Sequence, residues 1–137
     1  MALLSVKNLS IGFRNGRRVI PVVSGVTFDV APGEVLALVG ESGCGKSISC
    51  LALTGLLPPR LAEVTSDGIM YETRGGGAVD LARLSGRAMR RVRGGGIAYI
   101  FQEPAASLNP VLTVGRQLAD SNSGRSSSRN FVPPISQ

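Results

Sequence analysis

The sequence has no histidine, and only two of its 137 residues are cysteine, Cys44 and Cys50. The absence of imidazole excludes histidine-dependent catalytic triads, histidine zinc ligands and histidine phosphate sensors. Two cysteines are too few for a disulfide framework or for a metal site with four thiolates. Such sparse cysteine is typical of proteins that work in a reducing cytosol.

Long apolar runs are missing as well. Val35–Val39 and Leu51–Leu57 are the best apolar stretches, and both are far shorter than the ~18–20 residues that a membrane-spanning helix needs. The segment Met1–Ile11 has no apolar core of the length found in signal peptides. We therefore expect a soluble protein, made in the cytosol, with no transmembrane segment of its own.

Lysine and aromatic residues are scarce, whereas arginine is abundant. Lys7 and Lys46 stand beside thirteen arginines, and the formal net charge is +6. Such a charge suits nucleic acid or an anionic membrane surface. Because aromatic residues make up only 4% of the chain and no RRM, KH or zinc-finger pattern is present, we expect no nucleic-acid partner.

Five short segments have the hydrophobic pattern of strands. Alternation of apolar and polar residues predicts Leu3–Leu9, Val26–Val30 and Ile69–Glu72, with a turn at residues 15 and 16. Val35–Val39 and Ile97–Phe101 are continuous apolar runs, which are typical of strands buried on both faces.

Two helices are predicted from the same kind of pattern. Lys46–Leu57 follows a glycine-rich break, and the prolines at 58 and 59 end it. Leu81–Val92 has Asp80 as a candidate N-cap and an apolar stripe along one face. The opposite face carries four arginines, which we interpret as a solvated surface: Arg83, Arg87, Arg90 and Arg91.

The composition of the chain changes at about Asp120. Six of the 18 residues from Asp120 to Gln137 are serine, and the segment has no helical or strand period. We interpret residues 120–137 as a disordered, serine-rich tail and residues 1–119 as the folded part of the chain.

One motif carries a specific chemistry. The pattern G-x-x-x-x-G-K-[ST], the Walker A phosphate loop, is matched by Gly40, Glu41, Ser42, Gly43, Cys44, Gly45, Lys46 and Ser47. Glycines let the backbone curl so that its N–H groups point at a phosphate, and a helix N-terminus adds its positive dipole. Lys46 would reach the β- and γ-phosphates, and the Ser47 hydroxyl would bind Mg²⁺.

The motif alone does not identify the nucleotide or the reaction. A GTPase reads guanine with an N-K-x-D motif, which neither Lys7 nor Lys46 can form because Val6 and Gly45 precede them. A GTPase is therefore disfavoured. Another phosphate-loop enzyme, such as a small-molecule kinase, stays open at this point, and so does a non-catalytic fragment that binds nucleotide or a partner.

The order of several segments resembles the front half of an ATP-binding cassette (ABC) transporter ATPase. Leu9–Phe13, Val26–Glu34 and the Walker A loop follow that family's order. Ile100–Pro104 and the segment from Ala106 to Gly115 are similar to the glutamine loop of importers of oligopeptides, dipeptides and nickel. The resemblance covers about residues 3–118. It implies an α/β fold, with a P-loop NTPase core and an antiparallel β subdomain.

The resemblance also implies roles for single residues. Gln102 would contact Mg²⁺ and the attacking water, and an amide suits this place because it both donates and accepts without adding charge. Phe13 would stack on adenine. Cys44 stands where some relatives carry serine. The implied ATP site thus consists of residues 40–47 with Phe13 and Gln102, and its metal contacts are Ser47 and Gln102.

Cofactors, partners and location follow from the same resemblance. The cofactors would be ATP and Mg²⁺. The partners would be transmembrane permease subunits and a second ATP-binding subunit, at the inner face of the cell membrane. Other subunits of such a transporter choose the transported substrate.

Three family motifs have no counterpart in this chain. None of the four aspartates, at positions 29, 67, 80 and 120, follows four apolar residues or precedes glutamate, as Walker B requires. Leu84-Ser85-Gly86 is not the L-S-G-G-Q signature, because arginine follows it and it precedes the glutamine loop. A switch histidine is impossible without histidine. We therefore expect a reading frame that is truncated or frame-shifted before the signature motif and Walker B, and ATPase activity stays uncertain.

Overall fold

The computed structural model describes residues 2–102 and 108–122. The chain forms two compact units, Met1–Tyr99 and Ile100–Gln137. The predicted tail falls mostly outside the described residues. Its first three positions, 120–122, end the helix of the second unit, which we label α3 (Val114–Asn122).

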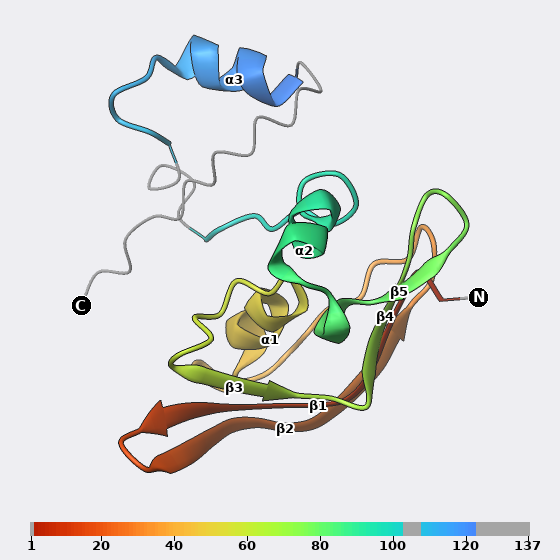
Figure 1. Cartoon of the computed structure of the whole chain (residues 1–137), viewed down its shortest axis with the longest axis vertical. Helices are drawn as coiled ribbons and strands as arrows, with labels where there is room; N and C mark the ends of the chain where they lie inside the picture. The colour runs from red at the N-terminus through yellow and green to blue at the C-terminus, as the bar shows by residue number, and fades with distance from the viewer. Residues whose placement is uncertain (1, 103–107, 123–137) are drawn as a thin grey trace. The chain divides into compact units, whose positions relative to one another are not determined.

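The first unit is built on an antiparallel sheet (Figure 1). Its strands are β1 (Leu4–Asn15), β2 (Arg18–Val30), β3 (Ala62–Thr65), β4 (Gly68–Glu72) and β5 (Ala78–Asp80). The order is β2-β1-β4-β5, and β1 is the central strand because β2 lies along one edge while β4 and β3 share the other. The early strands and the strand at 69–72 are thus confirmed, although β1 and β2 are longer than predicted. The predicted turn lies one position later, at residues 16 and 17, because Asn15 still pairs with Arg18.

A bulge in β1 explains its irregular hydrophobic pattern. Asn8 has a left-handed backbone (φ 52°), and its N–H donates to Thr27 Oγ1 across the strand pair at 2.9 Å. The register with β2 shifts on both sides of Leu9. Because the extra residue resets the alternation, Val6 and Leu9 are both fully buried although they are three positions apart.

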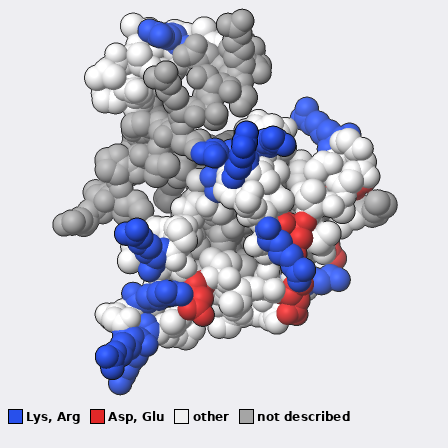
Figure 2. All heavy atoms as spheres, in the orientation of Figure 1, with Lys and Arg blue, Asp and Glu red and all other residues white. Residues whose placement is uncertain are grey.

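The core lies between this sheet and three short helical segments. These are α1 (Lys46–Leu53), the 3₁₀ turn η1 (Leu81–Arg83) and α2 (Gly86–Val92). The sheet supplies most of the buried side chains, and the helical segments supply Ala52, Leu81 and Met89. The four arginines predicted to be solvated are exposed, and Figure 2 shows basic side chains gathered over α2.

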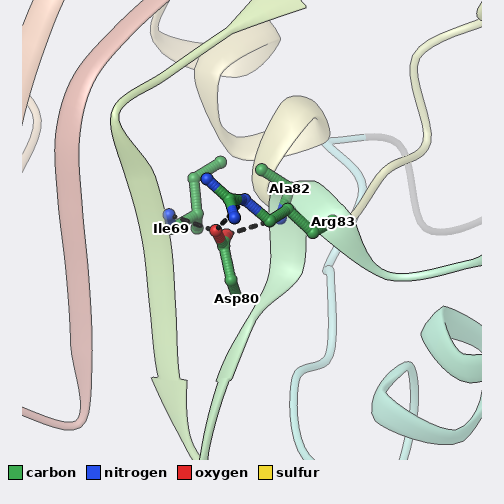
Figure 3. Close-up of polar contacts among 4 residues, drawn as sticks. All are labelled: Ile69, Asp80, Ala82 and Arg83. Atoms are coloured by element: carbon green, nitrogen blue, oxygen red, sulfur yellow. Dashed lines mark hydrogen bonds and ion pairs between the residues drawn. The ribbon is translucent and has the colours of Figure 1, made fainter.

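Asp80 joins two strands and the turn that follows them (Figure 3). Its Oδ1 accepts hydrogen bonds from the Ile69 N–H in β4 at 3.1 Å and from the Ala82 N–H at 3.0 Å. Its Oδ2 lies 3.3 Å from the Arg83 Nε. The predicted N-cap is confirmed. Asp80 also accepts a hydrogen bond from β4, the strand that pairs with β5.

The prediction of a single helix over residues 81–92 is wrong, because the segment divides at Leu84 and Ser85 into η1 and α2. Both residues are extended, and the Ser85 hydroxyl accepts a hydrogen bond from the Ala88 N–H at 3.3 Å. Serine before glycine favours a new helix start over continuation, because its side chain bonds a first-turn N–H and Gly86 is a poor interior residue. The predicted helix 46–57 starts correctly and ends early, at Leu53, before the left-handed Gly55 (φ 61°).

Two predicted buried strands are not formed. Val35–Val39 forms no helix or strand and pairs with no described strand, and Val35 and Val39 are 94% and 92% exposed. Ile97 makes one isolated bridge with Arg93, and Ile100 is 88% exposed. A strand buried on both faces needs neighbours on both sides, and the described residues of this chain supply none.

Replacing Asp80 with alanine tests how much its hydrogen bonds to Ile69 and Ala82 stabilise the first unit. We expect Asp80→Ala to lower the free energy of unfolding by about 1–2 kcal/mol, because two backbone N–H groups lose their acceptor. Asp80→Asn keeps an Oδ1 acceptor and should lose less than half as much. Arg83→Ala is the matched control and should cost below about 0.5 kcal/mol, since Arg83 is 85% exposed. Urea unfolding of the chain measures all three, and equal losses for Asp80→Ala and Arg83→Ala would contradict this assignment.

Candidate functional site

The loop formed by residues 40–47, called here the phosphate loop, turns sharply into α1. Gly43 and Gly45 have left-handed backbones, with φ of 82° and 91°, a region that glycine enters without steric cost. The Cys44 N–H donates to the Glu41 carbonyl oxygen at 3.3 Å. The motif glycines therefore do what the sequence predicts, and the helix begins at Lys46.

Gly45 fixes the loop to the sheet and to the helix. A Cβ built on Gly45 would lie 2.5 Å from Val23 Cγ2 and 3.4 Å from the Val22 carbonyl oxygen, both in β2. On its other side, the Gly45 carbonyl oxygen accepts from the Ser49 N–H at 2.8 Å and from the Ser49 Oγ at 2.9 Å. The start of α1 is thus held between β2 and its own first turn.

The Lys46 side chain folds back over the loop. Its Nζ donates to the carbonyl oxygens of Gly40 and Glu41, both at 2.6 Å, and lies 3.4 Å from Cys44 Sγ. The loop is closely wound at this point, because a Cβ on Gly40 would meet Cys44 Sγ at 2.6 Å. The ammonium group is therefore positioned inside the curl rather than extended into solvent.

The residues present fit an anionic phosphate. The first N–H groups of an α-helix have no intrahelical acceptor, and together they carry partial positive charge. The first turn of α1 has no acidic residue to neutralise it, and Lys46 adds a full charge beside it. Around Gly43 a Cβ would meet nothing within 4 Å, and Ser47 is exposed, so an entering group has both room and a hydroxyl.

The described residues offer little for direct metal binding. No group of three or more histidine, cysteine, aspartate or glutamate side chains gathers among them. The Asp80 oxygens already accept from two backbone N–H groups and pair with Arg83. Within the first unit, a divalent cation at this site would thus depend on Ser47 and on the phosphate itself.

The other predicted site residues lie apart from the loop in the chain. Phe13 is half-buried in β1, opposite Ile20 of β2 and Ala62 of β3. The same strand pair carries Val23, which packs against Gly45. Gln102 is exposed and belongs to the second unit, so its role at Mg²⁺ stays a prediction.

Two polar side chains with clear structural roles were not predicted from the sequence. Gln117 of α3 accepts from the Asn109 N–H at 2.8 Å and donates to the carbonyl oxygens of Asn109 and Leu112 at 3.1 and 3.0 Å. It closes the segment that resembles the end of the glutamine loop. Arg93 contacts the far end of α1, through hydrogen bonds to Thr54 and Gly55. A glutamine in a helix and an arginine among arginines carry no local signal of such bonds.

Comparison with known proteins shows the family to which the sequence is similar. A family model described as ABC transporter matches residues 23–132. A dipeptide transport ATP-binding protein of Bacillus subtilis (strain 168) is 47% identical over 118 residues, which is 86% of this chain and 34% of that protein. A glutathione import ATP-binding protein of Shigella boydii is 44% identical over 119 residues, covering 87% of this chain and 19% of that protein.

The chain therefore spans about a third or less of the length of these relatives. In the described residues, no helix combines the length and the apolar character that crossing a membrane requires.

Alanine at the two left-handed glycines tests how the loop is held. Each substitution should cost about 1–2 kcal/mol for the backbone alone. Gly45→Ala should cost about 1–3 kcal/mol more than Gly43→Ala, because only its new methyl group meets Val23. Adding Val23→Ala to Gly45→Ala should give a smaller total loss than the sum of the single losses. Urea unfolding measures each free energy, and equal losses at the two glycines would contradict the packing of Gly45 on β2.

Proposed function

Because this chain belongs to the ABC transporter family, we propose that its phosphate loop binds Mg²⁺-ATP as part of a transporter ATP-binding subunit. The observation that carries the proposal is the position of the Lys46 Nζ, 2.6 Å from two loop carbonyl oxygens at the start of α1. A triphosphate that enters the curl offers the ammonium group charged oxygens in place of neutral ones. Hydrogen bonds to charged partners are stronger than those to neutral partners, so the exchange favours binding.

The remaining contacts divide between the phosphates, the metal and the base. Residues 40–47 would surround the phosphates with backbone N–H groups, from Glu41 and Ser42 as well as from the glycines. The Cys44 N–H would exchange the Glu41 carbonyl oxygen for a phosphate oxygen. Ser47 would hold Mg²⁺ through its hydroxyl, with Gln102 as the second protein ligand. Phe13 would stack on adenine. The bound metal would supply neutralisation of phosphate charge.

The names of the relatives support a role in peptide import. One acts in dipeptide transport and the other in glutathione import, and both cargoes are small peptides. We extend this to the protein of which the chain is a part. Its partners would be transmembrane permease subunits and a second ATP-binding subunit, and it would lie on the cytoplasmic face of the membrane.

ATP binding without turnover is the form of this function that the chain's own residues support. Hydrolysis needs a carboxylate that orients the attacking water and completes the metal shell. The sequence has no aspartate in a Walker B context, and Asp80 is engaged with the backbone of β4 and η1. Lys46 and Ser47 suffice to hold phosphate and metal, but they supply no base.

The two lysines of the chain allow a controlled test of ATP binding. We expect Lys46→Ala to weaken Mg²⁺-ATP binding by about 10-fold or more, as the loss of a charged hydrogen-bonding group implies. Lys7→Ala removes the same charge from an exposed position on β1 and should change the affinity by less than about twofold. Isothermal titration calorimetry on the three forms measures the effect. Equal weakening by both substitutions would reduce the role of Lys46 to net charge and contradict the proposal.

Phosphate release gives a second, independent measurement. We expect the chain to release no phosphate from ATP above the background rate, because the sequence has no aspartate in a Walker B context. Lys46→Ala should therefore leave the release unchanged. A steady rate that disappears in Lys46→Ala would contradict this expectation, and it would point to a carboxylate such as Glu103, which follows Gln102 in the sequence.

A further inference from the structure

Arg93 clamps the end of α1 that lies opposite the phosphate loop. Its Nε donates to the Thr54 carbonyl oxygen, and its Nη2 donates to the Gly55 carbonyl oxygen, each at 2.6 Å. Both carbonyls follow the last residue of the helix, Leu53, where backbone oxygens lack intrahelical donors and carry partial negative charge. The planar guanidinium group spans two such oxygens at once, which an ammonium group cannot do with the same geometry.

The contact is close and partly desolvated. A Cβ on Gly55 would lie 2.9 Å from the Arg93 Nη2 and 3.5 Å from Met89 Cε, so the glycine allows the guanidinium to approach. Burial, with a smaller effect from the positive charge of Arg90, lowers the pKa of Arg93 from its ordinary value. Among the described residues no carboxylate pairs with it. In the part of the chain that the structure describes, its guanidinium group binds the two carbonyl oxygens.

The residues that follow Arg93 form a closed turn. The N–H groups of Gly96 and Ile97 both donate to the Val92 carbonyl oxygen, at 2.8 and 2.9 Å. The Gly94 N–H donates to the Ile97 carbonyl oxygen at 2.8 Å. Gly96 lies against the ring of Tyr71, because a Cβ there would meet the Tyr71 hydroxyl at 2.7 Å. The turn 93–97 is therefore closed by its own hydrogen bonds and packs on Tyr71 of β4.

We propose that Arg93 is a positioning residue that couples the far end of α1 to the turn 93–97, from which the chain continues to Gln102. With eight residues, α1 is about 12 Å long and transmits a displacement as a rigid body. An anion bound at its N-terminus and the closed turn at its C-terminus thereby stabilise each other. The inference rests on the proposed function, because it takes Mg²⁺-ATP as that anion.

Hydrogen exchange with and without Mg²⁺-ATP tests the coupling. In the unsubstituted chain, ATP should raise the protection of the Gly94, Gly96 and Ile97 amides by about fivefold or more. In Arg93→Gln this gain should vanish. Arg91→Gln is the matched control, because it removes an exposed arginine of α2, the helix that ends just before Arg93, and it should keep the gain.

Linkage requires a second effect on affinity. Arg93→Gln should weaken Mg²⁺-ATP binding by the same factor by which ATP protects the turn. Arg93→Lys keeps the charge but places it on a single donor nitrogen, so it should retain an intermediate gain. This variant serves if the glutamine variant does not fold. A purely structural Arg93 would lower overall stability and leave the ratio of protection with and without ATP unchanged.

The outcomes separate this inference from the proposed function. ATP binding that leaves the turn unprotected, or protects it equally in Arg93→Gln, would overturn the inference and leave the proposed function standing. Absence of Lys46-dependent ATP binding in the unsubstituted chain would overturn the proposed function, and the inference with it.

Discussion

The junction at Gly45 is the constraint on which the site depends. Gly45 has a left-handed backbone, and a Cβ at this position would lie 2.5 Å from Val23 Cγ2 of β2. Its carbonyl oxygen accepts two hydrogen bonds from Ser49. Any other residue would bring strain to the backbone and a clash with Val23. Because the helix starts immediately after it, the direction of α1 and the place of Lys46 are both consequences of this packing.

The phosphate loop and the start of its helix were predictable from the sequence because their determinants are local. Glycines at fixed positions need no distant partner in order to adopt φ near +80°, and Asp80 needs only the following N–H group to cap a turn. Strands behave differently. Val35–Val39 has the composition of a buried strand, yet its burial depends on neighbours, and in the described residues it stays exposed.

Competition between local interactions explains the other differences. The apolar spacing of residues 81–92 favours one helix, but the Ser85 hydroxyl stabilises a new start at Gly86. In β1 the bulge at Asn8 buries both Val6 and Leu9, which no two-residue period describes. Arg93 lies two residues after Arg91 and has the same side chain. Only the fold shows that Arg91 is exposed while Arg93 binds the end of α1. The site residues Phe13 and Gln102 rest on resemblance rather than geometry.

The two ends of α1 carry cations with opposite consequences for the helix. Arg93 lies where the helix dipole is negative, and it is held there by two carbonyl oxygens, so the charge and the dipole attract. Lys46 lies at the positive end, in a first turn without acidic residues, so the charge and the dipole repel. Carbonyl oxygens of Gly40 and Glu41 compensate Lys46 only with partial charges. The partial negative charge at the C-terminal end of α1 is therefore neutralised by Arg93. The positive charge at the loop end is left, and it attracts an anion.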